Sequence, residues 1–213
     1  MNQLVTIADP SSTQSEAYRT LRTNLSFYSL DQGFDTLVVT SPSPQDSAYL
    51  ATANLAVTMA QGGKRTILVE ADLRRPSIHI PFGLDAEPGL TDALLTDGAI
   101  PAQKTTVEGL SVLTSGARPP NPADLLGSQK VDDVIVSLKA EYDLIIFNAP
   151  PVLAASDATV LGGKVNGVLL TVHSGQTRRD YAQKACEALR KANIRIIGAA
   201  LIDAPLDTSI GEY

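Results

Sequence analysis

One segment near residue 40 has the layout of a phosphate-binding loop. The apolar run at residues 36–40 predicts a buried strand, a polar segment follows it, and helical spacing begins at Ala48. In a parallel sheet such a unit is a ready anion site, because the N–H groups at the helix start point outward. A working loop also needs glycines, a Lys for the β- and γ-phosphates, and then a Ser or Thr for Mg²⁺. Residues 42–47 contain no Gly and no Lys, so the segment by itself is interpreted as an ordinary loop.

A second charged group lies on the helix expected before that strand. At about 100° per residue, Arg19 lies about 300° and Arg22 about 240° from Glu16. The apolar residues of this helix fall between about 120° and 200° on the same wheel, and they are Tyr18, Leu21, Leu25 and Tyr28. Charge therefore occupies one side, with Arg22 near the border, which leaves the three free to meet a neighbouring molecule. Alternatively, Glu16 and Arg19 form a pair within the helix, worth about 0.2–0.5 kcal/mol.

Composition excludes several classes of function. The net charge is −6 with a sequence pI near 4.9 and no block rich in Lys or Arg, so we expect no nucleic-acid partner. Cys186 is the single cysteine and is expected in a helix core, which excludes an internal disulfide. His79 and His173 lack a neighbouring ligand pattern and are interpreted as structural, so no metal site is predicted. These features fit a reducing cytosol.

Length and hydropathy set further bounds. The 213 residues suit one α/β domain with a sizeable core. We predict no signal peptide, because the apolar patch at residues 4–7 is short and the first positive side chain is Arg19. No apolar run approaches the roughly 18 residues of a membrane span. A cytoplasmic protein without direct membrane insertion is expected, and any membrane association must come through a partner.

Strand and helix signals alternate along the chain. Short runs rich in Val, Ile and Leu predict buried strands at residues 36–40, 66–69, 110–114, 144–147, 168–172 and 194–202. Helical spacing predicts helices at residues 48–61, 131–140 and 178–192. The Pro-rich stretch at residues 117–122 is expected to be an ordered surface loop, with Asn121 or Asp124 beginning the next helix. The alternation favours an α/β fold with a mostly parallel sheet and helices on both faces.

Six fragments occur in an order that resembles a known family. They run from about Ser15 to Leu153 and read Glu16-Ala-Tyr-Arg-Thr-Leu-Arg-Thr-Asn-Leu, Val39-Thr-Ser-Pro, Ala53-Asn-Leu-Ala, Ala71-Asp-Leu-Arg-Arg-Pro, Pro119-Pro-Asn-Pro-Ala-Asp-Leu-Leu-Gly and Pro150-Pro-Val-Leu. In these the chain resembles the cytoplasmic bacterial tyrosine kinases of capsule and exopolysaccharide export, a branch of the deviant-Walker P-loop ATPases. The resemblance implies one doubly wound, P-loop-NTPase-like domain over residues 1–213. Residues 1–14 would be an N-terminal extension and residues 207–213 a short C-terminal tail.

The departures from the family pattern fall where its chemistry should be. Where the family has Gly-Glu-Gly-Lys-Ser-Thr, the sequence has Gln45-Asp46-Ser47-Ala48-Tyr49-Leu50. Glu70 stands for the first Asp of the second acidic motif, Asp72 keeps the second, and Asn148 replaces the Mg²⁺-organising Asp. The expected degenerate pocket comprises Gln45, Asp46, Ser47, Ala48, Tyr49, Glu70, Asp72 and Asn148.

Simpler roles remain open for several of these residues. Glu70 and Asp72 can end a strand and cap the turn after it. Asn148 can be a turn residue before Pro150, and Arg74 and Arg75 can be a solvated or salt-bridged pair rather than an anion site.

Simple electrostatics predicts what these replacements cost. A Lys about 5 Å from a phosphate contributes roughly 3 kcal/mol per charge pair, so its loss weakens triphosphate binding about a hundredfold. Asp46, Glu70 and Asp72 would face the anion without a countercharge, and the Tyr49 ring would fill the Mg²⁺ position. We therefore expect weak or absent ATP and Mg²⁺ binding and no catalytic residue, which is a pseudokinase.

The resemblance also bears on assembly and phosphorylation. Glu16, Arg19 and Arg22 match the family's Glu-x-x-Arg-x-x-Arg motif, which joins neighbouring subunits in a ring, so self-association is expected. The family's C-terminal tyrosine cluster is missing, and Tyr213 is the sole tyrosine of the tail. Phosphorylation of Tyr213 by another kinase remains an open alternative.

The expected work of the chain is binding. By resemblance, the partner is the cytoplasmic end of an inner-membrane polysaccharide co-polymerase, which the chain would regulate or scaffold in capsule, holdfast or other exopolysaccharide export. It would be recruited to the inner membrane through that partner. One alternative is a tyrosine kinase or ATPase with residual activity through backbone amides and Asp72. Another is a partition-like positioning protein.

Overall fold

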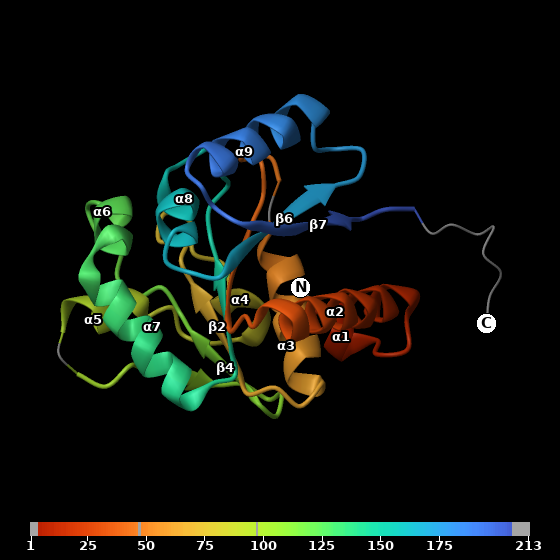
Figure 1. The fold of residues 1–213 in the computed structure, drawn as a ribbon. Helices are drawn as coiled ribbons and strands as arrows, with labels where there is room; N and C mark the ends of the chain where they lie inside the picture. Colours follow the sequence, from red (N-terminus) through yellow and green to blue (C-terminus); the bar gives the residue numbers. More distant parts are fainter. Residues whose placement is uncertain (1–3, 47, 97, 206–213) are drawn as a thin grey trace.

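The structure is a computed structural model that describes residues 4–46, 48–96 and 98–205, without the side chains of residues 29–32. Its described residues form a seven-stranded sheet with the strand order β3-β4-β2-β5-β1-β6-β7 (Figure 1). The strands are β1 (Thr36–Thr40), β2 (Thr66–Glu70), β3 (Gln103–Lys104), β4 (Leu110–Leu113), β5 (Leu144–Asn148), β6 (Gly167–His173) and β7 (Ile196–Ile202). Every neighbouring pair is parallel except β3 and β4, which confirms the predicted fold class.

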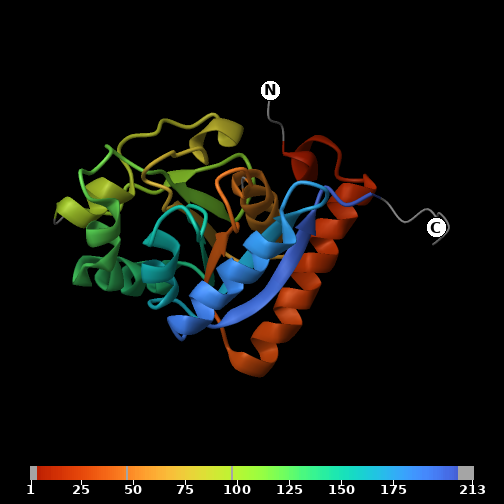
Figure 2. The same cartoon turned by 90° about the horizontal axis from the view of Figure 1, so that it is seen from above.

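Helices cover both faces of this sheet (Figure 2). One face carries α1 (Val5–Ala8), α2 (Thr13–Gln32), α3 (Tyr49–Gln61) and α4 (His79–Phe82). The other carries α5 (Leu90–Leu95), α6 (Pro122–Gly127), α7 (Gln129–Glu141), α8 (Asp157–Gly162) and α9 (Arg179–Lys191). Alternate residues of each central strand serve the two cores: Val38 packs into one and its neighbours Leu37 and Val39 into the other, as the two-residue period of a strand requires.

The winding of the sheet brings three loops together. The chain passes from β1 to β2 on one side and returns through β5, which pairs with both β1 and β2. Asn148 is in register with Val39 of β1 and with Glu70 of β2. The carboxyl ends of β1, β2 and β5 therefore meet at one place, where open parallel sheets bind ligands.

Several boundaries differ from the sequence expectations. The last strand begins at Ile196 rather than at residue 194, because its pairing with β6 begins with Ile196 beside Val168. The elements α1, β3, α4, α5 and α8 are absent from the sequence prediction, since pieces of two to six residues are too short to show a period. The Pro-rich stretch does lead into a helix, with Asn121 as N-cap and Pro122 at its first position.

The structure describes the N-terminal segment from residue 4 but not the C-terminal tail. The expected N-terminal extension contributes to the core, because Leu4 is buried and Thr6 donates its backbone N–H and its hydroxyl to Asn54 Oδ1. The predicted tail at residues 207–213, with Tyr213, lies outside the described residues. Within the described part of the chain, no helix is long and apolar enough to cross a bilayer.

Candidate functional site

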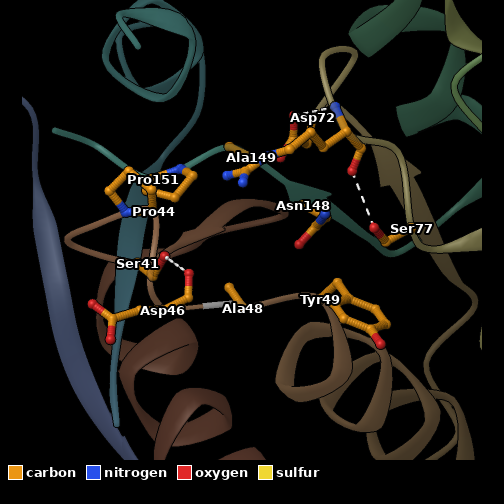
Figure 3. Close-up of a pocket in the computed structure, with 11 residues that line it drawn as sticks. Ser41, Pro44, Asp46, Ala48, Tyr49, Asp72, Ser77, Asn148, Ala149 and Pro151 are labelled. Carbon is orange, nitrogen blue, oxygen red and sulfur yellow. Dashed lines mark hydrogen bonds between the residues drawn. The ribbon is translucent and has the colours of Figure 1, made fainter. Parts of the chain in front are cut away.

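A pocket of about 170 Å³ opens where the loops after β1, β2 and β5 meet (Figure 3). It is lined by Ser41, Pro44, Asp46, Ala48, Tyr49, Asp72, Arg75, Ser77, Asn148, Ala149 and Pro151. Pockets that hold drug-sized ligands are about 300–1,000 Å³, so this one is small. Five of the predicted residues line it, whereas Gln45 is exposed outside it, Glu70 is buried away from its lining, and Ser47 lies outside the described residues.

Glu70 is a fully buried carboxylate held by N–H donors. Its Oε1 accepts from Asp72 N at 3.0 Å and Asn148 Nδ2 at 2.8 Å, and its Oε2 accepts from Ser77 N at 2.7 Å and Ile78 N at 2.8 Å. Burial raises its pKa to about 7, and the four donors act in the opposite direction. The capping alternative is confirmed, because Glu70 closes the turn that comes directly after its own strand.

Asp72, two residues after Glu70, also caps backbone N–H groups of the turn after β2. Its Oδ1 accepts from the backbone N–H groups of Arg74 and Arg75, at 3.2 and 2.9 Å. Of the two acidic residues predicted after β2, Asp72 alone lines the pocket.

Asn148 ends strand β5 and is therefore not the turn residue that one alternative expected. Its amide donates to Glu70, and its Oδ1 accepts from Thr52 Oγ1 at 3.3 Å. Both polar ends of this buried side chain are used inside the protein. An Asp here would face Glu70 with a second carboxylate, and two such groups in contact cannot both ionise freely without a cation between them.

The loop after β1 is closed by its own carboxylate, so the prediction that Asp46 faces an anion is wrong. Its side chain turns away from Ala48 and Asn148 (Figure 3) and accepts from Ser43 Oγ and Thr177 Oγ1, each at 2.8 Å. Ser41 Oγ donates to the Asp46 carbonyl at 2.8 Å. A buried carboxylate needs such donors, and the sequence does not reveal the two hydroxyls because Thr177 lies far along the chain.

The prediction for the Tyr49 ring is also wrong. Figure 3 shows the ring directed away from Ala48 and Asn148 along the side of α3. The side chain is half-buried against the core on the α2–α3 face. It therefore borders the pocket without filling the position where a metal would sit.

The two consecutive arginines have different roles. Arg74 forms an ion pair with Asp157 at 3.1 Å, and Asp157, in the first turn of α8, is completely buried. Arg75 is exposed and supplies the one positive side chain among the residues that line the pocket. Sequence analysis missed this role, although the Ala71-Asp-Leu-Arg-Arg-Pro fragment contained the signal.

The residues at this site do not fit a nucleotide with Mg²⁺. Phosphate-binding nests use left-handed residues to turn successive N–H groups inward, and none of the described residues of the loop 41–48 has positive φ. The oxygens of Glu70 are saturated by N–H donors, and Asn148 offers no carboxylate. In the described ranges, no group of three or more His, Cys, Asp or Glu side chains is arranged to hold a metal.

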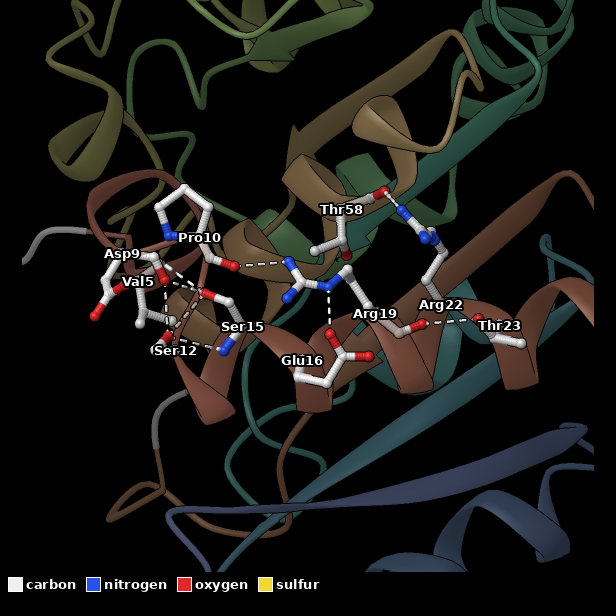
Figure 4. A network of polar contacts seen from close by, with 10 residues as sticks. All are labelled: Val5, Asp9, Pro10, Ser12, Ser15, Glu16, Arg19, Arg22, Thr23 and Thr58. Carbon is white, nitrogen blue, oxygen red and sulfur yellow. Dashed lines mark hydrogen bonds and ion pairs between the residues drawn. The ribbon is translucent and has the colours of Figure 1, made fainter. Parts of the chain in front are cut away.

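The three residues predicted for self-association are largely used within the chain (Figure 4). Arg19 pairs with Glu16 at 2.7 Å and donates to the Pro10 carbonyl at 2.8 Å. Arg22 Nη1 donates to the Thr58 carbonyl of α3 at 3.0 Å. The alternative of a Glu16–Arg19 pair within the helix is confirmed. The expectation that all three side chains are free is wrong, and Arg22, at the border of the apolar stripe, reaches the neighbouring helix.

The two histidines and the cysteine considered in the sequence do not line the pocket. His173 Nδ1 lies 3.1 Å from Asp203 Oδ2, where β6 and β7 end. Cys186 is half-buried on α9 against the core, near its expected place. His79 lies on the short helix α4, and its Nδ1 is buried without a hydrogen-bond partner among the described residues.

Several curated proteins that are similar to this chain are named as bacterial tyrosine-protein kinases. The chain is 40% identical over 200 residues to the tyrosine-protein kinase YwqD of Bacillus subtilis. The aligned region covers 93% of this chain and 84% of YwqD. It is 34% identical over 191 residues to the putative tyrosine-protein kinase EpsB of Ralstonia solanacearum, covering 89% of this chain and 26% of EpsB. No protein-family model matches the sequence.

Solved structures that are at least 30% identical to this chain superpose on nearly all of it. The chimerical protein CapA2B2 superposes with a TM-score of 0.92 at 31% identity, over 97% of this chain and 92% of that one. The kinase domain of the Escherichia coli tyrosine kinase ETK superposes with a TM-score of 0.90 at 30% identity, over 99% of this chain and 83% of that one.

Proposed function

Because this chain belongs to the bacterial tyrosine-protein kinase family of capsule and exopolysaccharide biosynthesis, we propose that it is a catalytically inactive member whose work is binding. Phosphoryl transfer depends almost wholly on positioning the phosphates and neutralising their charge. The chain has Ala48 and Tyr49 where the family pattern has Lys and Ser, and Asn148 where it has the metal-organising Asp. A pseudokinase keeps the fold and loses this chemistry.

The observation that carries the proposal is the contact between Glu70 and Asn148. The amide N–H lies 2.8 Å from the Glu70 carboxylate and supplies the positive end that a divalent cation would otherwise supply. Both residues are buried, so binding Mg²⁺ here would first require breaking this hydrogen bond and those to Asp72, Ser77 and Ile78. The pair is complete without a metal.

The proposed partner is the cytoplasmic end of an inner-membrane polysaccharide co-polymerase. The sequence that matches nearly all of this chain is only about a quarter of EpsB, so in EpsB the kinase-like domain is covalently joined to further sequence. The kinase-like domain of EpsB thus works next to that further sequence, and we propose that the present domain works in comparable surroundings by binding a membrane partner. We propose that the chain regulates or scaffolds export of a capsule, holdfast or similar polymer from the cytoplasmic face of the inner membrane.

Calorimetric titration with Mg-ATP and Mg-ADP tests the loss of chemistry. We expect no binding heat at ligand concentrations that saturate YwqD, which serves as the positive control. Micromolar binding of either nucleotide to this chain would overturn the pseudokinase proposal.

Affinity capture from membranes tests the partner. The expected result is recovery of a polysaccharide-assembly membrane protein with the full chain as bait. A capture that yields no such component, while the bait stays folded, would remove the co-polymerase from the proposal and leave the nucleotide result standing.

A second candidate is a binder of nucleotide with residual kinase activity. Arg75 favours it, because an exposed guanidinium at the pocket edge can pair with a phosphate group. The same titration with Arg75→Ala separates the two functions, since a signal that depends on Arg75 supports the second candidate.

A further inference from the structure

The surface of α9 and its two flanks is strongly basic in an otherwise acidic chain. We define the basic face as Arg178, Arg179, Lys184, Arg190, Lys191 and Arg195, all of which are exposed. Residues 178–195 hold these six cations and two carboxylates, a net charge of +4, so the rest of the chain carries −10 against a total of −6. Sequence analysis overlooked this group because the cations are dispersed through a helical pattern and form no continuous run.

The fold explains why these cations point outward. Helix α9 packs on the sheet through Ala185 and Leu189 and forms an outer layer of the molecule (Figures 1 and 2). At 100° per residue, Arg179 and Arg190 lie about 20° apart on the helix circumference. They form one row on the side away from Ala185.

Among the described residues, three of the six cations of the basic face have partners within the chain, and one of these is Arg195, which lies 5.1 Å from the centroid of the Tyr28 ring of α2. Asp180 lies 2.9 Å from Arg178 Nε and 3.6 Å from Lys184 Nζ. Those two cations also lie over the Tyr181 ring, at 4.9 and 5.7 Å from its centroid. In the part of the chain that the structure describes, Arg179, Arg190 and Lys191 have no carboxylate within ion-pair distance.

We propose that the basic face docks on the anionic phospholipid headgroups of a membrane surface. A tight protein interface needs aromatic or aliphatic anchors that are buried on binding, and the large exposed apolar side chains of the described residues all lie on other elements. A helix surface that offers mainly long cationic side chains, beside Asp180 and the exposed Glu187, and no large exposed apolar one suits a surface of dispersed negative charge. The acidic remainder of the chain opposes this weakly, because charges more than about 8–10 Å from the surface are screened at physiological salt.

This inference deepens the proposed function, since it states how a chain recruited to the inner membrane would be oriented there. The basic face would lie against the lipid beside the partner. Binding to protein-free lipid is independent of the partner, so the two ideas can fail separately.

Vesicle co-sedimentation of the full chain tests the proposal, with phosphatidylcholine vesicles with and without phosphatidylglycerol. We expect binding only to the anionic vesicles and weakening as salt rises. Each cation at an anionic surface strengthens partitioning about fivefold, so the double variant Arg179→Glu, Arg190→Glu should bind at least about 25-fold more weakly. Placing Glu at the start of α9 and Glu in its last turn has opposing effects on the helix dipole, which limits any effect on folding.

The matched control is the double variant Lys104→Glu, Arg118→Glu. It changes the net charge equally and both cations are exposed; Lys104 lies on β3 at the opposite end of the sheet from β7, and Arg118 lies in the connection between β4 and α6, away from α9 in sequence. It should bind anionic vesicles to within a few-fold of the unchanged chain. Equal loss in both variants, or no binding of the unchanged chain to anionic vesicles, would overturn the proposal. A different result would assign the basic face to an acidic protein instead: the unchanged chain does not bind vesicles, but reversing the α9 charges abolishes its capture of a membrane protein.

Discussion

At the scale of single residues, the site is defined by a carboxylate and an amide that satisfy each other. Glu70 receives four N–H donors, and Asn148 is one of them. Hydrogen bonds to a charged group contribute about 1.5–3 kcal/mol, whereas a buried charge without partners is severely penalised. With an amide rather than a second carboxylate beside Glu70, the two side chains satisfy each other by a hydrogen bond.

Restoring the carboxylate should destabilise the protein. We expect Asn148→Asp to lower the free energy of unfolding by about 3 kcal/mol at about pH 8, because two buried carboxylates would then be in contact. Near pH 5 the loss should be smaller, since one proton can be shared between them. Urea unfolding at the two pH values measures both effects.

Asn148→Ala is the control, because it removes the donor without adding charge. It should cost about 1–3 kcal/mol with little dependence on pH. Added Mg²⁺ should recover part of the stability of Asn148→Asp and none of that of the unchanged chain. Equal stability of Asn148→Asp and the unchanged chain at about pH 8 would contradict this account of the pair.

Glu70 should also give the protein an unusual pH dependence. Its pKa is about 7 in the folded state, above its ordinary value of 4.5. Between these values the folded state holds a proton that the unfolded state has released, so the free energy of unfolding falls as pH rises, by about 3 kcal/mol in total. The contribution is fully present below about pH 4.5 and is lost above about pH 7.

The variant Glu70→Gln tests this, because it cannot titrate. Chemical unfolding of both proteins measures the free energy of unfolding between about pH 5 and pH 8. Over this range it should fall by about 3 kcal/mol more in the unchanged chain than in Glu70→Gln. Parallel pH profiles of the two proteins would show that Glu70 does not carry the dependence.

At the scale of elements, short connections decide where the charged side chains go. The turn after β2 is fixed by Asp72, which accepts from the backbone of both arginines. Arg74 then pairs with the buried Asp157 of α8, whereas Arg75 stays exposed at the pocket. Two identical neighbouring residues thus serve the core and the surface.

Arg74→Ala should therefore be much more damaging than Arg75→Ala. Removing Arg74 leaves the fully buried Asp157 carboxylate without its cation, and because Arg74 is 40% exposed we expect a loss of about 2 kcal/mol rather than the full cost of a buried pair. Arg75→Ala should change stability by less than about 0.5 kcal/mol. Thermal and urea unfolding of the two variants provide the comparison, and similar losses would argue against the ion pair.

At the scale of the whole molecule, one sheet with a core on each face holds the pocket at the point where its strand order reverses. The two surfaces that we propose for partners or nucleotide, the pocket side and the basic face of α9, lie on different parts of the described residues. Helix α2 is a weaker candidate than its sequence indicated, because Arg22 is bound to α3.

The mass of the protein in solution tests self-association through α2. If the motif joins subunits, Glu16→Ala with Arg19→Ala should reduce the mass to that of one chain while stability changes by less than about 1 kcal/mol, because the pair within the helix is weak. Arg22→Ala is expected to lower stability by about 1 kcal/mol whatever the assembly. A mass of one chain for the unchanged protein, or an unchanged mass in the double variant, would count against this interface.

The sequence by itself determined the fold class, the order of the main elements and the family, because apolar periodicity and six ordered fragments are local properties of the chain. Through the resemblance to the family's acidic motifs it also identified Glu70, Asp72 and Asn148. Tertiary structure alone decided how these side chains are used. Asp46 turned inward because Thr177, far along the chain, offers a hydroxyl, and Arg22 bound α3 because the helices pack together. Contacts between distant segments depend on how the elements are wound, and no local pattern records that.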